Sequence, residues 1–284
     1  MKYALYNGSL VPHKQALIPI EKKEVLFSFG VYESLKVKRG VPLFIDEHLG
    51  RFFDSARIME LIHPFTASDI AGGIHELIRV NKIDDATIRI QMYGGEVPFY
   101  YAFSSALPRY PERYYSEGID VISYEGERFL PRAKSNCLLL NFMAQREADR
   151  ASALEALLVN REGKVLEGSR SNLFALKDRT LVTAEDEVLH GVTRKHIIQC
   201  CGQNNIDVEY EPLRMEDILQ GVYDGICISS TSMGAVPVRR FDGKSLAPQE
   251  TRRETLRQTI ALFNRFLTMQ ENDEIEKGLR KDDS

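Results

Sequence analysis

The sequence predicts an α/β protein of two domains, and three observations lead to this prediction. The chain has 284 residues, which is enough for two ordinary domains with a core each. Strands with period-two alternation occur along the chain among helices with one apolar face. A polar, proline-rich stretch at Leu107–Arg113 interrupts this pattern. We therefore expect a smaller N-terminal α/β domain at 1–110, a linker at 111–118 and a larger C-terminal domain at 119–284.

The first domain is expected to combine short strands with two helices. Asn7-Gly8 is typical of a hairpin turn, and Asp46 is a residue type that caps helices. In order, we expect a strand pair within Tyr3–Pro19, a strand at Val31–Val37, a helix from Asp46 to about Met59, a helix from Thr66 to Asn81 capped by Thr66 or Ser68, and a strand at Ala86–Tyr93.

The second domain is expected to alternate strands and helices and to end in a long helix. That helix carries apolar residues on one face, and the charged tail 271–284 should be frayed. In order, we expect a strand at Ile119–Tyr124, a helix at Leu138–Ala151, strands at 155–159, 165–166 and 172–176, a helix at Thr193–Asn204 and the long helix at Gln249–Met269.

Composition excludes several classes of protein. Hydrophobic residues make up 43% of the chain and charged residues 27%, which is typical of a soluble globular protein. The net charge of −4 offers no basic surplus for nucleic acid, and no apolar run could span a bilayer. The start has no signal-peptide core, so we expect a cytoplasmic protein. The four cysteines have no metal-ligand spacing, and we expect buried free thiols and no metal site.

An ordered set of short motifs carries the functional information. The set begins at Lys134 and continues with Glu167-Gly168-Ser169, Ser171-Asn172-Leu173-Phe174, Leu189-His190-Gly191-Val192-Thr193-Arg194 and Thr231-Ser232 ahead of Val236-Pro237-Val238. Each motif alone is weak, but the ordered set resembles the class IV aminotransferases, which are pyridoxal 5′-phosphate (PLP) enzymes of fold type IV. Only Val192, in place of isoleucine, departs from the family pattern. The resemblance implies a two-domain fold with a barrel-like larger domain that binds PLP.

The resemblance assigns the two catalytic residues. Lys134 matches the lysine that forms the Schiff base with PLP and moves the substrate proton, whereas most lysines are simply solvated. Glu167 matches the acid that keeps the pyridine nitrogen protonated, which makes the ring an electron sink. For a glutamate beside a turn, the general alternative is an exposed carboxylate.

The cofactor's phosphate has three candidate partners. Gly191-Val192-Thr193 opens a helix, whose first N–H groups favour an anion. Thr231 lies in a Ser/Thr-rich turn, and Arg51 matches the family's phosphate arginine, although it could instead be an ion-pair partner. Leu189 matches the leucine that packs on the pyridine ring, and its alternative is an ordinary core leucine.

The substrate residues form a mosaic. Tyr32 matches a pocket aromatic residue, and Arg89 matches an arginine of the branched-chain enzymes, although Thr87 replaces the tyrosine of their motif. Gly94 stands where D-amino-acid aminotransferases carry an arginine. Strand alternation places Arg89 opposite its apolar neighbours, facing either a pocket or solvent. If Arg89 faces solvent, the turn at Thr231-Ser232 becomes the candidate for binding the substrate carboxylate.

The sequence therefore predicts a homodimeric PLP-dependent aminotransferase. It would move an amino group between an amino acid, branched-chain or hydrophobic and of L or D configuration, and a 2-oxo acid in a ping-pong reaction. An aminodeoxychorismate lyase, which eliminates pyruvate with the same machinery, is the alternative enzyme. A PLP-binding protein without turnover is the alternative outside catalysis.

Overall fold

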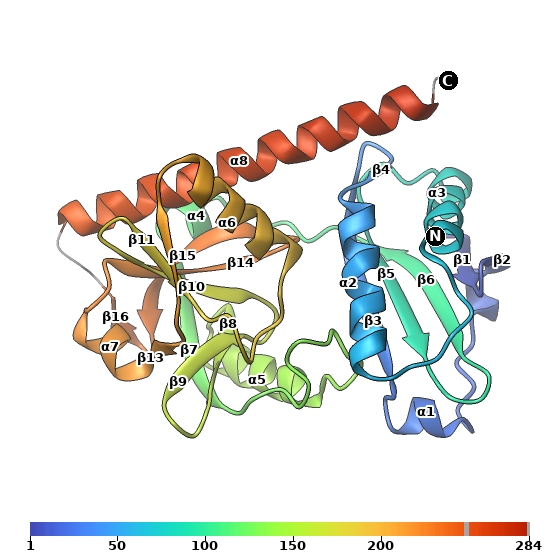
Figure 1. Cartoon of the computed structure of the whole chain (residues 1–284), viewed down its shortest axis with the longest axis horizontal. Helices are drawn as coiled ribbons and strands as arrows, with labels where there is room; N and C mark the ends of the chain where they lie inside the picture. The colour runs from blue at the N-terminus through green and yellow to red at the C-terminus, as the bar shows by residue number, and fades with distance from the viewer. Residues whose placement is uncertain (247–249, 283–284) are drawn as a thin grey trace. The chain divides into compact units, whose positions relative to one another are not determined.

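The computed structural model describes residues 1–246 and 250–282, which form two compact units (Figure 1). The first unit contains Met1–Pro108, Ala133–Cys137 and the described residues from Gln270 onward. The second unit contains the described residues of Arg109–Arg132 and Leu138–Met269. The α/β class is as predicted. The expected ranges treated each domain as continuous, whereas the short segment around Lys134 and the end of the last helix both group with the first unit.

The first unit is built on an antiparallel sheet in the order β2-β1-β6-β5-β3-β4. Its strands are β1 (Tyr3–Tyr6), β2 (Ser9–Pro12), β3 (Gly30–Lys38), β4 (Val41–Pro42), β5 (Ala86–Tyr93) and β6 (Phe99–Ser105). From Val31 onward burial alternates along β3, so the odd-numbered residues face the core and the even-numbered residues are half-buried on the other face. The central pair β3–β5 positions the substrate candidates described below.

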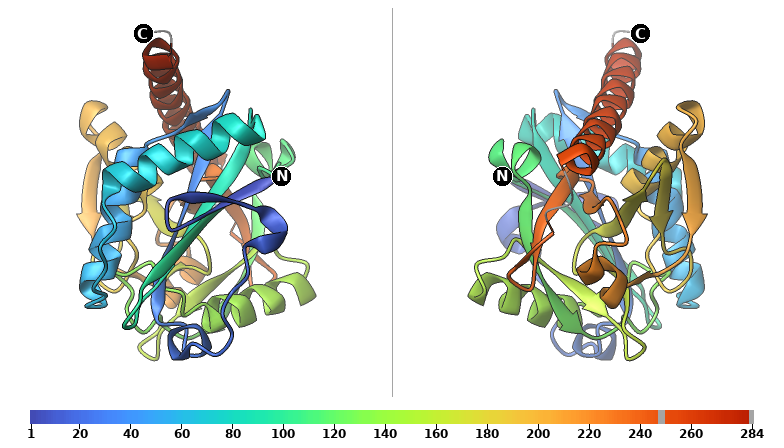
Figure 2. Two further views of the ribbon diagram at one scale, coloured as in Figure 1. Left: turned by 90° about the vertical axis from the view of Figure 1, so that its right-hand side faces the viewer. Right: turned by 90° about the vertical axis from the view of Figure 1, so that its left-hand side faces the viewer.

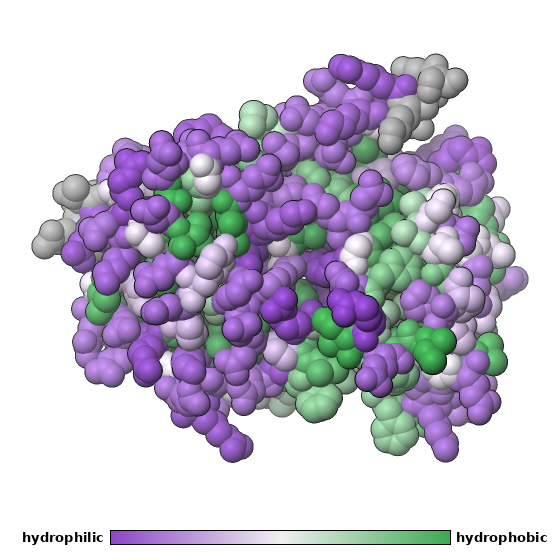
Figure 3. Space-filling model, in the orientation of Figure 1, coloured by the Kyte–Doolittle hydropathy of each residue, from purple (hydrophilic) through white to green (hydrophobic). Residues whose placement is uncertain are grey.

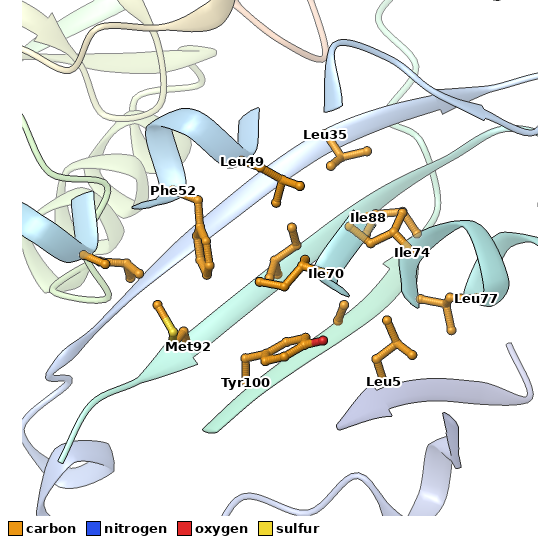
Figure 4. Packing of buried hydrophobic residues seen from close by; sticks show 14 of the residues in the cluster. Leu5, Leu35, Leu49, Phe52, Ile70, Ile74, Leu77, Ile88, Met92 and Tyr100 are labelled. Carbon is orange, nitrogen blue, oxygen red and sulfur yellow. The ribbon is translucent and has the colours of Figure 1, made fainter. Parts of the chain in front are cut away.

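Two helices cover the core face of this sheet, α2 (Ile45–Ile58) and α3 (Ala67–Asn81) (Figure 2). Their apolar faces pack on residues of β1, β3, β5 and β6, and Figure 4 shows this packing around Phe52, Ile70 and Ile88. Shorter helical segments are η1 (His13–Gln15) and α1 (Lys23–Leu26). The predicted cap of α3 is confirmed, because the Thr66 hydroxyl accepts a hydrogen bond from the Asp69 N–H at 3.2 Å.

The second unit is built on a mixed sheet that closes on itself. Along the sheet the order is β12-β11-β10-β14-β15-β7-β8-β9-β13, and β9 pairs in addition with β10. Strands β10, β14, β15, β7, β8 and β9 therefore form a closed ring, as the barrel-like prediction requires. The strands are β7 (Ile119–Glu125), β8 (Glu155–Val159), β9 (Lys164–Gly168), β10 (Asn172–Lys177), β11 (Thr180–Thr183), β12 (Asp207–Tyr210), β13 (Leu213–Arg214), β14 (Gly225–Ser230), β15 (Gly234–Phe241) and β16 (Lys244–Ser245).

Helices pack outside this sheet. They are α4 (Arg113–Ser116), α5 (Leu139–Arg150), α6 (Val192–Gln203), α7 (Met215–Gln220) and α8 (Glu250–Asp282). The predicted apolar face of the last helix is confirmed, because its buried residues Leu256, Ile260 and Phe263 pack against α6 and β10. No helix within the described residues is long and apolar enough to cross a membrane.

Three expectations need correction, and a fourth is untested. Asp46 does not cap α2: Phe44 holds the cap position in a left-handed conformation, and Asp46 lies in the first helical turn, where a negative charge favours the helix dipole. The tail expected to fray continues α8 to Asp282, because Ile275 is buried against Leu43. Cys137 is exposed, unlike the other cysteines. The predicted start of the last helix at Gln249 lies outside the described residues.

Candidate active site

Lys134 belongs to a short segment that lies beside β3 in the first unit. The Lys134 carbonyl accepts a hydrogen bond from the Tyr32 N–H at 2.9 Å, and the Lys134 N–H donates to the Ser55 hydroxyl at 3.0 Å. One residue on, Ser135 forms an isolated bridge with Val31. The main chain of Lys134 is thus fixed by a strand and a helix, while its side chain is half-buried.

The approach of this segment to β3 requires a glycine. A Cβ atom at Gly30 would lie 2.1 Å from the Met92 carbonyl oxygen and 2.5 Å from Nδ2 of Asn136. Asn136 in turn donates from its backbone N–H to the Gly30 carbonyl at 2.8 Å. Any side chain at position 30 would therefore displace either β5 or the lysine segment.

The Tyr32 ring contacts both Lys134 and Arg89, the arginine predicted to bind substrate. The Lys134 Nζ lies 4.6 Å from the centroid of the Tyr32 ring, and the Arg89 guanidinium carbon lies 4.4 Å from the same centroid. Both contacts are within cation–π range. Arg89 pairs across the strands with Ser34, so it lies on the same half-buried face as Tyr32. Arg89 therefore lies on the face of the sheet where Lys134 Nζ also contacts the Tyr32 ring.

Gly94 is enclosed by an aromatic side chain. A Cβ atom at this position would lie 2.4 Å from a Phe29 ring carbon and 3.1 Å from Leu61 Cγ. The arginine that D-amino-acid aminotransferases carry here would require Phe29 to move.

Arg51 forms a buried ion pair. Its Nε lies 2.9 Å from Oε2 of Glu33, and its Nη2 lies 2.6 Å from Oε1 of the same carboxylate. His48 Nδ1 lies 3.2 Å from Glu33 Oε1. Burial alone would raise the pKa of Glu33, but Arg51 and His48 outweigh it and hold the pKa well below its usual range. Sequence reasoning weighed an ion pair against phosphate binding for Arg51, and the ion pair is present.

Glu167 lies near the end of β9 in the second unit, where its pairing with Asn172 closes the barrel. The side chain is buried, and both carboxylate oxygens are engaged. Oε1 accepts a hydrogen bond from Arg128 Nε at 2.7 Å, and Oε2 accepts one from the Leu189 backbone N–H at 3.1 Å. Arg128 also donates to the Pro131 carbonyl. Glu167 is therefore a fixed, ion-paired carboxylate and not the exposed residue of the alternative reading.

Asn172 links Glu167 to the start of α6. Its Nδ2 donates to the Leu189 carbonyl at 2.7 Å, and its Oδ1 would lie 2.2 Å from a Cβ atom at Gly191. Glu167, Leu189 and Gly191 thus gather around one asparagine. The Leu189 residue is half-buried, as a side chain that packs on a ligand would be, whereas an ordinary core leucine would be fully buried.

The N-terminus of α6 is suited to an anion. Gly191 caps this helix without a side-chain hydrogen bond, and no acidic residue occupies its first turn. The first backbone N–H groups of a helix lack intrahelical partners and carry partial positive charge. Val192 is buried, whereas Thr193 is half-buried with its hydroxyl at this end of the helix.

Thr231 and Ser232 occupy the turn between β14 and β15. The turn follows Ser229, which pairs with Asn172 across the sheet, so it starts near the same edge of the barrel. The Ser232 hydroxyl lies 3.1 Å from the Tyr110 hydroxyl, and Tyr115 donates to the Met233 carbonyl at 2.9 Å. Two tyrosines thus hold this turn in place.

Sequence reasoning missed three residues that hold the candidates: Glu33 and Ser55 in the first unit, and Arg128 in the second. Glu33 had a visible signal, because it is the one charge at the inward positions of β3. Arg128 precedes its partner by 39 residues, and no local pattern connects the two.

Comparison with known proteins identifies the family. The family model for amino-transferase class IV matches residues 30–241. The chain belongs to this family. It is therefore a class IV aminotransferase, an enzyme family whose cofactor is pyridoxal 5′-phosphate.

Individual relatives fall into two groups. The chain is 28% identical to a D-alanine aminotransferase from Bacillus licheniformis over 85% of this chain and 89% of that protein. It is 30% identical to a D-alanine aminotransferase from Listeria monocytogenes, over 86% and 89%. It is also 29% identical to a putative branched-chain-amino-acid aminotransferase from Methanocaldococcus jannaschii, over 84% and 87%.

Solved structures share the fold. A branched-chain aminotransferase from Thermoproteus uzoniensis aligns with a TM-score of 0.83 at 22% identity, covering 96% of this chain and 97% of that one. A hypothetical aminotransferase from Mycobacterium tuberculosis in its PLP-bound form aligns with a TM-score of 0.79 at 22% identity, covering 92% and 98%. The two-unit architecture is therefore that of fold type IV.

The residues present fit this cofactor. The second unit offers a buried carboxylate for a ring nitrogen and an uncapped helix start for a phosphate, next to a glycine at which a Cβ atom would collide with Asn172. The first unit offers a half-buried lysine whose main chain is fixed. Among the described residues, no group of histidine, cysteine and acidic side chains could hold a metal ion.

Proposed function

We propose that this enzyme transfers an amino group from an amino acid to a 2-oxo acid, with Lys134 as the residue that carries PLP. The observation that carries the proposal is the fixed main chain of Lys134, whose Nζ contacts the same Tyr32 ring as Arg89. An amino-acid substrate must contact two groups at the same time. One is the amine that carries the cofactor, and the other is a cation that binds the substrate carboxylate.

Each cofactor residue has a defined task. When bound, PLP supplies an electron sink for the carbanion that forms at the substrate Cα. Glu167 holds the proton at the ring nitrogen by its negative charge, and Leu189 packs against the ring. In the second unit, the N–H groups of Gly191, Val192 and Thr193 and the Thr231 hydroxyl would bind the phosphate, and in the first unit the Arg51 guanidinium is the candidate for the same task. Lys134, once its amine is free, would remove the proton from the substrate Cα and deliver it to C4′ of the cofactor.

Arg89 and Tyr32 are proposed to bind the substrate α-carboxylate. A guanidinium can donate two parallel hydrogen bonds to a carboxylate, and the Tyr32 hydroxyl can add a third. Ser232, in the turn beside Thr231, is the candidate for further contact with the substrate. The D-alanine and branched-chain enzymes among the relatives support a small or branched hydrophobic amino acid. Gly94, next to the Phe29 ring, offers no guanidinium at the position of the D-specific arginine, so any arginine that binds the carboxylate must come from another position, for which Arg89 is the candidate.

A panel of amino donors tests the proposed reaction. Purified enzyme should convert 2-oxoglutarate or pyruvate into the matching amino acid when supplied with alanine, valine, leucine or isoleucine of one configuration. Production of pyruvate from aminodeoxychorismate, with none of these transfers, would replace the proposal by the lyase reaction. Absence of both activities in PLP-loaded protein would leave a binding protein without turnover.

We also propose that the chain forms a homodimer. Large apolar side chains are exposed in the segment that follows β2: Leu17, Ile20, Leu26 and Phe27 are each at least 66% exposed. Figure 3 shows a largely hydrophilic face on which apolar side chains gather in a few separate groups. Large apolar side chains that are exposed close together in the chain are candidates for a protein interface. Light scattering should give twice the mass of 32.4 kDa, and a monomer at that mass would contradict the proposal.

A further inference from the structure

Glu33 occupies a position in β3 where a charge is unfavourable. The side chain is fully buried, and its neighbours on the inward face of the strand, Val31, Leu35 and Val37, are apolar and equally buried. The facing strand adds Ile88 and Ile90 to the same core. A carboxylate in such surroundings loses its hydration, which costs several kcal/mol unless other groups compensate.

The compensation comes almost entirely from one helix. Arg51 of α2 binds both carboxylate oxygens, and His48, one turn earlier on the same helix, lies 3.2 Å from Oε1. The Ser34 backbone N–H also donates to Oε1 at 2.8 Å. The Arg51 side chain remains 12% exposed, whereas the Glu33 side chain is fully buried.

Stability alone does not explain this pair. A buried ion pair often contributes no more stability than apolar residues of similar volume, because desolvation offsets the attraction between the charges. What the bidentate contact supplies is geometry, since it fixes the plane of a guanidinium that a flexible side chain would otherwise leave mobile.

The same turn of α2 also holds the lysine segment. The Ser55 hydroxyl accepts from the Lys134 N–H at 3.0 Å and donates to the Arg51 carbonyl at 2.8 Å. The Lys134 carbonyl, in turn, accepts from the N–H of Tyr32, the residue next to Glu33. Glu33, Arg51, Ser55 and Lys134 thus form a closed chain of contacts that relates the arginine to the lysine.

We infer that Glu33 is a positioning residue, which holds the Arg51 guanidinium at a set place relative to Lys134 so that it binds the phosphate of the cofactor. This inference rests on the proposed role of Arg51. Glu33 has two opposite effects on a bound phosphate. Its negative charge repels a phosphate, whereas its hydrogen bonds orient the arginine that binds one. Positioning is the larger effect, so removing the carboxylate weakens phosphate binding even though it removes a repulsion.

The test compares PLP with pyridoxal, which has the same ring and aldehyde but no phosphate. Apo-enzyme is titrated with each compound, and the dissociation constants are measured from absorbance. The variants are Glu33→Gln, Glu33→Asp and Arg51→Gln. Glu76→Gln is the control, because Glu76 forms a similar bidentate pair with Arg79 on the exposed face of α3. Thermal unfolding identifies any variant that does not fold, and Glu33→Asp replaces Glu33→Gln if that variant fails.

Arg51→Gln should weaken PLP roughly 10-fold to 100-fold, as expected for the loss of charge-assisted hydrogen bonds, and leave pyridoxal unchanged. Glu33→Gln should raise the dissociation constant of PLP about tenfold and leave that of pyridoxal unchanged. The double variant should bind PLP only slightly more weakly than Arg51→Gln alone. Glu76→Gln should match the unmodified enzyme with both compounds.

Three results would overturn the inference. Tighter PLP binding by Glu33→Gln would show that charge repulsion dominates. Unchanged PLP binding by Glu33→Gln, with a loss in Arg51→Gln, would refute positioning by Glu33 and leave the phosphate role of Arg51 standing. Unchanged PLP binding by Arg51→Gln would remove that phosphate role and the inference together.

Discussion

Arg89 is the residue on which the proposed substrate recognition depends most directly. Its guanidinium carbon lies 4.4 Å from the centroid of the Tyr32 ring, on the face of the sheet where Lys134 Nζ also contacts that ring. Replacing Arg89 by alanine should raise KM for amino acids by roughly 10-fold to 100-fold, because a charge-assisted hydrogen bond is worth about 1.5–3 kcal/mol. The affinity for PLP should not change. Unaltered amino-acid kinetics would move carboxylate binding to the turn at Thr231-Ser232.

Glu167 should matter for turnover and little for cofactor retention. Its carboxylate accepts hydrogen bonds from Arg128 and Leu189, and glutamine can keep the acceptor oxygen but not the charge. Glu167→Gln should therefore bind PLP and lower kcat about a hundredfold or more, since the proton at the ring nitrogen is no longer stabilised. Stopped-flow and steady-state kinetics measure this. Near-normal kcat with tight PLP binding would show that the carboxylate is structural.

For individual residues, the sequence predicted those that belong to the motifs but not the residues that hold them in place. Lys134, Glu167 and Gly191 are recognisable because each has fixed neighbours in the chain. Arg128 and Ser55 act through partners 39 and 79 residues away, and only the folded chain brings them together. The same holds for the face of Arg89, because alternation along a strand defines relative faces and not which of them is covered.

Among the elements, α2 carries a histidine whose charge state should set the acid stability of the first unit. Burial lowers the pKa of His48 below its ordinary value of 6.5, although Glu33 partly opposes the shift. The folded protein therefore favours neutral His48. The contribution of neutral His48 to folding stability is fully present above pH 6.5 and is lost as the pH falls through the lowered pKa.

The midpoint temperature of thermal unfolding should therefore decrease as the pH is lowered from 6.5 to 4.5. This interval lies above the pH range in which Glu33 takes up protons. His48→Asn should lose less over this interval, because it removes the titrating ring. His63, whose pKa burial also lowers, is present in both proteins and cancels in the comparison. Parallel curves for the two proteins would contradict the assignment.

The turn between β9 and β10 depends on a second buried carboxylate with the opposite shift. Glu155 Oε1 accepts hydrogen bonds from the Arg170 N–H at 2.6 Å and the Ser171 hydroxyl at 3.0 Å. Burial raises the pKa of Glu155 above its ordinary value of 4.5, in spite of Arg170. The folded protein therefore favours the neutral form, and stability is lost as the pH rises through the raised pKa.

Glu155→Gln keeps the acceptor oxygen and carries no charge, so it should not share this loss. As the pH rises from 4.5 to 8, the unfolding temperature of the variant should increase relative to that of the unmodified protein. Calorimetry at several pH values measures the difference. A constant difference would show that Glu155 does not titrate in this range.

Most elements were predictable because their patterns are local. The strand Ala86–Tyr93 has its predicted bounds, and α3 begins after its predicted cap. Strand β6 escaped prediction because its Phe99–Ala102 portion is buried without alternation, a pattern that a helix can also show. The helix α2 begins one residue before Asp46, because Phe44 adopts a left-handed conformation that no sequence pattern announces.

For the whole molecule, the arrangement of the chain into units was the least predictable feature. Residues 133–137 fold with the first unit although the chain on both sides of them belongs to the second. The contacts responsible join Lys134 to Ser55 and Ser135 to Val31, which are far apart in sequence. The lysine that the motifs identify is thus fixed by the sheet and helix that carry Tyr32, Arg89 and Arg51.

Covalent mapping can identify the lysine that carries the cofactor, which we propose is Lys134. Borohydride reduction of the PLP-loaded enzyme, followed by proteolysis and mass spectrometry, should place a single phosphopyridoxyl group on the peptide that contains Lys134. Lys134→Ala should fold, lose the near-visible cofactor absorbance and have no transaminase activity. A phosphopyridoxyl group on any other lysine, or full activity in Lys134→Ala, would contradict the account.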